Sequence, residues 1–140
     1  MSLGNQINEA LLIHLLASLP AEEFNQLTKY LEPVSLTLGK VLYESGDKMT
    51  HIYFPTTAII SLLYIMENGA TAEIGIAGNN GLIGIALFMG GETTPNRAVV
   101  QSAGKAVRMK ARHLRQEFAR GGIFQKILLA YTQSLITQIS

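Results

Sequence analysis

The chain has 140 residues, a net charge of +1 and no cysteine. The near-neutral charge argues against a strongly basic nucleic-acid-binding module, and the missing cysteines exclude disulfides and cysteine-ligated zinc or iron–sulfur centres. Hydrophobic residues make up 48% of the chain, which is typical of one globular domain with a real core. Because no apolar run is long enough to span a membrane and the N-terminus lacks the pattern of a secretory signal, we expect a cytoplasmic protein.

The N-terminal part of the chain predicts two helices. Leucines recur through residues 8–19 with the period of an amphipathic helix, and Asn8 is a suitable N-cap. Pro20 ends this helix and can begin the next one, which we expect over residues 21–30.

The middle of the chain predicts a series of short strands separated by glycine-rich turns. Such a series is typical of a compact β-barrel, sandwich or jelly roll. The step Asn68-Gly69 predicts a hairpin with a type I′ turn. We expect the last two strands to pair with each other around residues 102–105. The expected strands cover residues 34–38, 41–43, 51–54, 58–65, 70–76, 98–101 and 106–109.

Residues 84–98 form a cassette whose order suits an anion site. It opens on Gly84, continues through a short apolar run and a glycine-rich loop, and ends at Arg97 where a strand begins. Glycines let backbone N–H groups approach an oxyanion, a helix N-terminus favours negative charge, and arginine can donate two parallel hydrogen bonds. The same residue types also occur in ordinary surface loops, so the order of elements along the whole chain has to decide between an anion site and a surface loop.

Two helices are expected at the C-terminus, over residues 111–120 and 123–140, with a glycine pair between them. Apolar residues recur in the second helix at the spacing of a coiled-coil seam, although a helix that packs on its own core would give a similar stripe. The helix reaches Ser140 without a stop signal, so we expect it to continue in a longer protein. We expect a homodimer through Phe124, Leu128, Tyr131 and Leu135.

The order of these parts resembles the effector domain of the Crp/Fnr family of bacterial transcription regulators. The residues that carry the resemblance are the run 39–47, Ile52-Tyr53-Phe54, the run 81–84 and Arg97-Ala98-Val99-Val100. The resemblance implies a mainly β fold with flanking helices, namely a cyclic-nucleotide-binding-like β-roll or jelly roll. It implies one domain, with N-terminal helices over 1–30, the roll over 31–110 and C-terminal helices over 111–140. A helix-turn-helix domain is then expected downstream of this sequence.

The chain departs from nucleotide-binding members of that family at two positions. In those members a glutamate after the first glycine holds the ribose 2′-OH, and a hydroxyl residue after the arginine helps to hold the cyclic phosphate. Ile85 and Ala98 stand at these positions here. A buried hydroxyl without a partner costs roughly 1–3 kcal/mol, so we expect cAMP and cGMP to bind weakly or not at all. The expected effector site comprises Gly84, Ile85, Ala86, Glu92, Thr93, Thr94, Arg97, Ala98 and Gln138.

The predicted function is therefore a ligand-sensing regulatory domain without enzymatic activity. The alternatives are a ligand-free dimerisation module and a β-roll enzyme, for which the sequence offers no catalytic group. No cofactor is assigned; a cyclic nucleotide and another small anion are the ligand classes left open. The expected partners are a second copy, DNA through the downstream domain, and RNA polymerase. His14, His51 and His113 lack the spacing of a metal site, and haem ligation by one of the last two is a lesser alternative.

Overall fold

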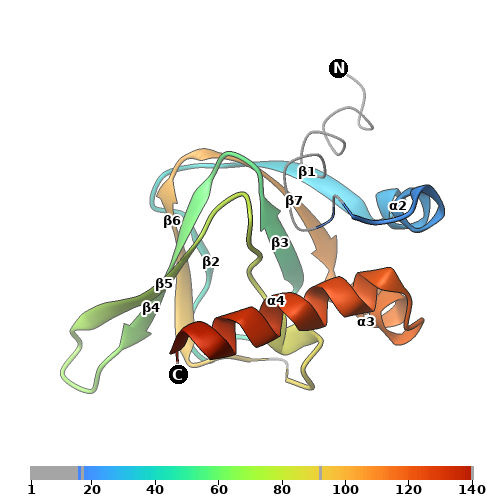
Figure 1. Ribbon diagram of the computed structural model, residues 1–140. Coiled ribbons are helices and arrows are strands. Elements are labelled where there is room, and N and C mark those ends of the chain that lie inside the picture. The colour runs from blue at the N-terminus through green and yellow to red at the C-terminus, as the bar shows by residue number, and fades with distance from the viewer. Residues whose placement is uncertain (1–15, 17, 92, 140) are drawn as a thin grey trace.

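The computed structural model describes residues 16, 18–91 and 93–139, with the side chains of 136–139 left out. Two antiparallel sheets form a roll with helices beside it (Figure 1). The three-stranded sheet has the order β1 (Leu31–Leu36), β7 (Gly104–Lys110), β3 (His51–Pro55). The four-stranded sheet has the order β2 (Val41–Tyr43), β6 (Asn96–Ser102), β4 (Ile59–Ile65), β5 (Thr71–Ala77). The predicted fold class, mainly β with flanking helices, is confirmed.

The helical elements are α2 (Ala21–Thr28), the 3₁₀ turn η1 (Ile85–Leu87), α3 (Ala111–Ala119) and α4 (Ile123–Ile139). Helix α2 follows Pro20 and carries Glu22 and Glu23 in its first turn, where negative charge is favoured. The helix expected over 8–19 lies almost wholly outside the described residues. Among the residues that are described, no helix is long and apolar enough to cross a membrane.

The expected pairing of the last two strands is wrong. β6 and β7 follow each other with only Ala103 between them, but they belong to different sheets. The chain crosses from one sheet to the other at Gly104, where an added Cβ would lie 2.5 Å from the backbone nitrogen of Ala58. Two segments with alternating apolar and polar residues and a glycine between them predict a hairpin. Here the same pattern forms a corner between the two sheets of the roll.

The predicted hairpin between β4 and β5 is confirmed, but its turn is not type I′. A type I′ turn needs positive φ at both central residues, and Asn68 has none. Gly69 alone adopts the left-handed region, with φ +86°, and the Met66 N–H donates to the Ala70 carbonyl over 2.8 Å. The loop is therefore one residue longer than the dipeptide suggested, with glycine at its last position.

The core has two parts that meet at β3. Because side chains alternate along a strand, Ile52 and Phe54 pack into a cluster with the helices, whereas Tyr53 packs into a cluster inside the roll. Leu87 of η1 and Leu114 of α3 belong to the helical cluster. Strand β3, against which the start of the cassette packs, is thus buried on both faces.

The expected dimer seam on α4 is corrected at two positions. Phe124 and Leu128 are 3% and 0% exposed and belong to the helical cluster of this chain, so they cannot contact a partner. The apolar stripe exists, but it packs on the chain's own core, which is the alternative that the spacing left open. Tyr131 and Leu135 are half-buried, and their part in an interface stays a prediction.

Candidate functional site

The first end of the cassette is fixed by its backbone. Ile83 exchanges two hydrogen bonds of 2.9 Å with Tyr53 of β3, which places Gly84 directly against that strand. Gly84 has φ +117°, and an added Cβ would lie 3.2 Å from the Cα of Ile52. Glycine is therefore required both by conformation and by space. The Gly84 carbonyl then accepts the Leu87 N–H over 3.0 Å, which opens η1.

The residues after Gly84 point into apolar surroundings. Leu87 and Phe88 are buried in the helical cluster, and Ile85 and Ala86 pack against it. Phe88 stacks on Phe118 of α3 with ring centroids 5.2 Å apart. Ile85 stands at the position of the family's ribose-binding glutamate. It has apolar neighbours and no acceptor for a hydrogen bond from a ribose hydroxyl.

The other end of the cassette is polar and ends in an ion pair. The Arg97 Nε donates to Oε1 of Glu44 over 2.7 Å, and the two side chains are 32% and 43% exposed. Two further contacts join the same segments: the Gly46 N–H donates to the Thr94 carbonyl over 2.8 Å, and Lys48 forms an isolated bridge with Thr93. Arg97 is thus paired with a carboxylate from the turn after β2. Glu92, which the sequence analysis placed in the effector site, lies outside the described residues.

Ala98 occupies a closed position in the middle of the four-stranded sheet. It is 0% exposed and lies opposite Tyr43 of β2 and Leu62 of β4. The Tyr43 side chain packs against both core clusters, and burial raises its pKa to about 12. The family's second phosphate anchor is therefore replaced by a methyl group beside a half-buried phenol.

The structure brings only part of the predicted site together. Arg97 and Ala98 lie in β6, and the Thr94 hydroxyl accepts the Asn96 N–H over 3.4 Å. Thr93 is exposed, and the Gln138 side chain lies outside the described residues. Sequence reasoning missed Glu44, although it directly follows the strand that pairs with β6.

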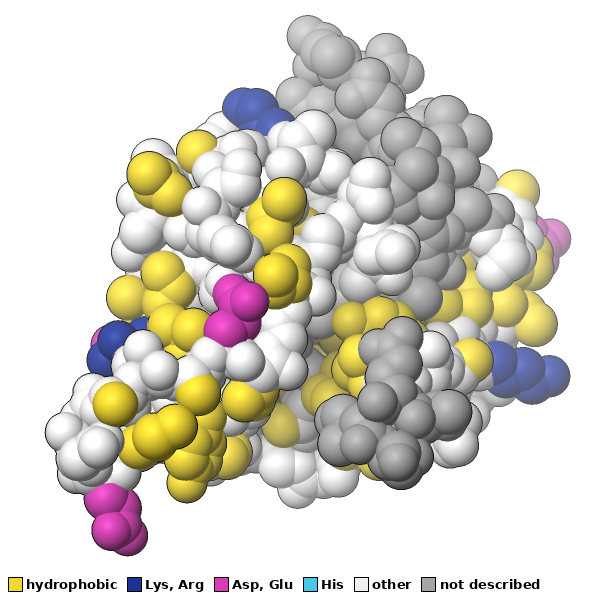
Figure 2. All heavy atoms as spheres, turned by 60° about the vertical axis from the view of Figure 1, so that its left-hand side comes forward, with side chains coloured by type: hydrophobic (Ala, Val, Ile, Leu, Met, Phe, Trp, Pro, Cys, Tyr) yellow, Lys and Arg dark blue, Asp and Glu magenta, His cyan; other side chains and the backbone are white. Residues whose placement is uncertain are grey.

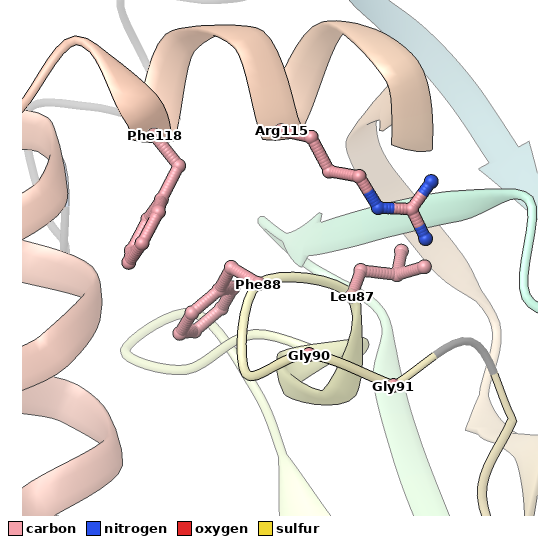
Figure 3. Close-up of a pocket in the computed structure, with 6 residues that line it drawn as sticks. All are labelled: Leu87, Phe88, Gly90, Gly91, Arg115 and Phe118. Atoms are coloured by element: carbon pink, nitrogen blue, oxygen red, sulfur yellow. The ribbon is translucent and has the colours of Figure 1, made fainter.

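An open hollow of about 660 Å³ lies on the helical side of the cassette (Figure 3). Its walls come from η1, from the glycine loop after it and from α3. Figure 3 shows the Phe88 and Phe118 rings side by side, and the Arg115 guanidinium reaching over Leu87. Arg97 is not among its lining residues, so this hollow is distinct from the ion pair with Glu44.

The histidines do not converge on a common site in the described part of the chain. The His51 Nδ1 lies 2.8 Å from the Thr50 hydroxyl, and its Nε2 lies 3.6 Å from Glu32. His113 stacks on Tyr30 with ring centroids 4.2 Å apart. The described residues contain no group of three or more His, Cys, Asp or Glu side chains that could hold a metal ion.

Comparisons with known proteins agree with this architecture. The family model of the cyclic nucleotide-binding domain matches residues 33–120, more than half of the 140 residues. No curated protein matches the sequence. The N-terminal domain of a transcriptional regulator from Streptomyces coelicolor A3(2) is 21% identical with a TM-score of 0.67, and the match covers 89% of this chain and 87% of that one.

Two further solved structures have the same fold. The sensor domain of the transcriptional regulator DNR from Pseudomonas aeruginosa is 15% identical with a TM-score of 0.75, over 99% of this chain and 92% of that one. The regulatory subunit of a cAMP-independent protein kinase A from Trypanosoma cruzi, bound to guanosine, is 14% identical with a TM-score of 0.74. That match covers 99% of this chain and 51% of the longer subunit. Identities this low show the shared fold alone. The family match, the two-sheet roll and the cassette between Gly84 and Arg97 together show that this chain belongs to the cyclic nucleotide-binding domain family, as its sequence predicted.

Proposed function

We propose that the chain is the ligand-sensing, non-catalytic domain of a Crp/Fnr-type transcription regulator, with its effector at the Arg97 end of the cassette. The family match supports a ligand-binding regulatory role, and two proteins of the same fold are transcription-regulator domains. In this proposal the effector acts on α3 and α4 and, through them, on a downstream DNA-binding domain in the longer protein.

The ion pair between Arg97 and Glu44 carries the proposal. An anion that binds Arg97 competes with Glu44 for the guanidinium, so full engagement of Arg97 by a ligand exchanges an internal carboxylate for an external anion. Both side chains are partly exposed, and an ion pair of this kind contributes about 1 kcal/mol or less. The pair is therefore weak enough to be opened by a ligand, and competition from Glu44 lowers the affinity for an anion by up to about fivefold.

Titration calorimetry with cAMP tests this proposal, with chemical-shift titration where binding is weak. We expect little or no binding by the natural chain. Glu44→Gln should raise the affinity by up to about fivefold, the factor that corresponds to about 1 kcal/mol. A dissociation constant in the low micromolar range for the natural chain would show that other groups have replaced the missing anchors.

The double variant Ile85→Glu with Ala98→Ser is the converse test. It restores a carboxylate and a hydroxyl at the two positions where the family's nucleotide-binding members have them, and we expect a gain in cAMP affinity. If the folded double variant still shows no binding, the loop between Gly84 and Arg97 closes the site, and the missing anchors do not.

An effector without a phosphate is the second candidate. A neutral ligand carries no charge that competes for Arg97, so the Arg97–Glu44 pair need not open, and the Trypanosoma cruzi subunit of the same fold was solved with guanosine. Guanosine is therefore included as a second titrant. Binding of guanosine by both the natural chain and Glu44→Gln with equal affinity would favour this candidate over an anionic effector.

We also propose a homodimer, formed by the exposed side of α4 and the hairpin of β4 and β5. Leu129 is 41% exposed on α4, and large apolar side chains gather on the hairpin (Figure 2). A second copy would cover these surfaces. The exposed large apolar residues of the hairpin are Ile59, Tyr64, Met66, Ile74 and Ile76.

Leu129→Glu tests the dimer, because it places a charge on the exposed side without touching the core. Light scattering should show a loss of dimer while circular dichroism shows a folded protein, and Lys126→Gln, which adds no negative charge to the helix, serves as the control. A Leu129→Glu protein that dimerises like the natural chain would place the interface elsewhere.

The chain alone is expected to bind no DNA specifically, given its net charge of +1.

A further inference from the structure

A small cavity of about 210 Å³ lies at the junction of α2, α3 and α4. The first turn of α2 lines it with Glu22 and Glu23, and the end of α3 lines it with Glu117. Its apolar wall is made by Leu27 and Phe124, which are both buried. The cavity belongs neither to the cassette nor to the hollow beside it.

Glu117 is the unusual residue of this cavity. It is 5% exposed, and its Oε2 is buried and accepts no hydrogen bond from any described residue. Its ion-pair partner is Arg120, whose Nη1 lies 4.0 Å from this oxygen on a side chain that is 62% exposed. This distance is too long for a hydrogen bond. A buried carboxylate oxygen without a donor is costly and rare in native proteins, and the described residues supply no donor to this oxygen.

The other carboxylates add negative charge at the same place. Glu23 Oε1 accepts the Ile123 N–H over 2.8 Å and so caps the start of α4. A carboxylate has several acceptor positions, so Glu23 can accept a further donor from the cavity. Glu22 is exposed at the rim. Three carboxylates thus face one guanidinium around the cavity, and the imbalance favours a cation.

We propose that this cavity binds a small organic cation with a primary ammonium group. An ammonium carries three donors and no acceptor, which matches a wall of carboxylates, and a short alkyl chain would lie against Leu27 and Phe124. The volume lies below the about 300–1,000 Å³ of drug-sized sites, so the ligand is a short amine or diamine. A metal ion fits less well, because the described carboxylates form no metal-binding group. This inference is independent of the function proposed for the cassette.

Titration calorimetry of the 140-residue chain with butane-1,4-diamine tests the proposal. We expect saturable binding of one diamine per chain at constant chloride concentration. Tetramethylammonium has a positive charge but no N–H donor, so we expect no saturable binding of it. Absence of saturable binding of the diamine, or equal binding of tetramethylammonium, would overturn the proposal.

Glu117→Gln identifies the site, because it keeps the shape of the side chain and removes its charge. We expect at least about tenfold weaker diamine binding, as for the loss of a charged hydrogen bond. Glu67→Gln, in the exposed turn between β4 and β5, is the matched control and should bind as the natural chain does. Thermal melting without ligand confirms that each variant is folded.

A second variant covers the case in which Glu117→Gln does not fold. Glu22→Gln at the exposed rim should fold and weaken diamine binding by a smaller factor than Glu117→Gln. If neither the Glu117→Gln nor the Glu22→Gln protein binds the diamine more weakly than the Glu67→Gln protein, the diamine binds elsewhere and the proposal is wrong.

Discussion

The two ends of the cassette are held in different ways. Gly84 is held by steric contact, with the Ile52 backbone behind it and buried apolar residues after it. Arg97 is held by an ion pair to Glu44 on partly exposed side chains. A steric contact inside a packed core has a single arrangement, whereas a surface ion pair exchanges partners at a cost of about 1 kcal/mol or less. The difference suggests that a ligand can change the Arg97 end while the Gly84 end stays fixed.

Gly84→Ala should give the largest effect, because it acts on the fixed end. The positive φ costs about 1–3 kcal/mol for alanine, and the Cβ also approaches the Ile52 backbone, so we expect a total loss of about 3 kcal/mol or more. Urea unfolding measures it. Gly90→Ala is the matched control: its φ is +95°, but nothing lies within 4 Å of an added Cβ. Equal losses for the two variants would contradict a steric contact at Gly84.

Raising the pH should weaken the strand next to the Arg97 end. Burial raises the Tyr43 pKa from 10.0 to about 12, so the unfolded chain loses this proton at lower pH than the folded one. The stability from neutral Tyr43 is fully present below pH 10 and is lost as the pH rises towards 12. At about 1.4 kcal/mol per pH unit, the loss amounts to about 2–3 kcal/mol.

Tyr43→Phe isolates this contribution from the other alkaline titrations. Urea unfolding of both proteins between pH 9 and 11.5 should show a stability difference that shifts in favour of the variant above about pH 10. A difference that is constant with pH would mean that the phenol ionises equally easily in the folded and unfolded chains.

Arg97→Gln should give the smallest effect on stability, less than about 1 kcal/mol, because the ion pair is partly exposed. Urea unfolding at low and high salt measures it, and Glu44→Gln should cost about as much. The double variant should cost no more than the larger of the two single changes. A loss of several kcal/mol would mean that the Arg97 end is as fixed as the Gly84 end.

Local signals in the sequence predicted a mainly β fold, and the resemblance to the Crp/Fnr family predicted the β-roll and the two ends of the cassette. Alternating apolar residues define strands, and the glycine at 84 and the arginine at 97 mark the ends of one loop. The partner of Arg97 could not be found in this way. Glu44 lies 53 residues earlier, and only the pairing of β2 with β6 brings the two together.

The stripe on α4 shows a second limit of sequence patterns. The four-residue spacing places Phe124 and Leu128 on one face of the helix, but a dimer seam and a contact with the chain's own core produce the same spacing. Likewise, alternation predicts two strands on either side of Ala103 without saying that they belong to different sheets. In both cases the deciding contact is with a segment far away in the chain.

The corner at Ala103 gives the molecule a mechanical property. β6 ends at Ser102, β7 begins at Gly104, and α3 begins at Ala111 directly after β7 ends at Lys110. Gly104 is wedged against the backbone of Thr57 and Ala58, with no room for a side chain. The run from Asn96 to Ala119 therefore consists of β6, β7 and α3 joined by a single rigid corner at Ala103, with no flexible loop between them. If Arg97 changes its partner as proposed, we therefore expect a displacement of β6 to be transmitted through β7 towards α3.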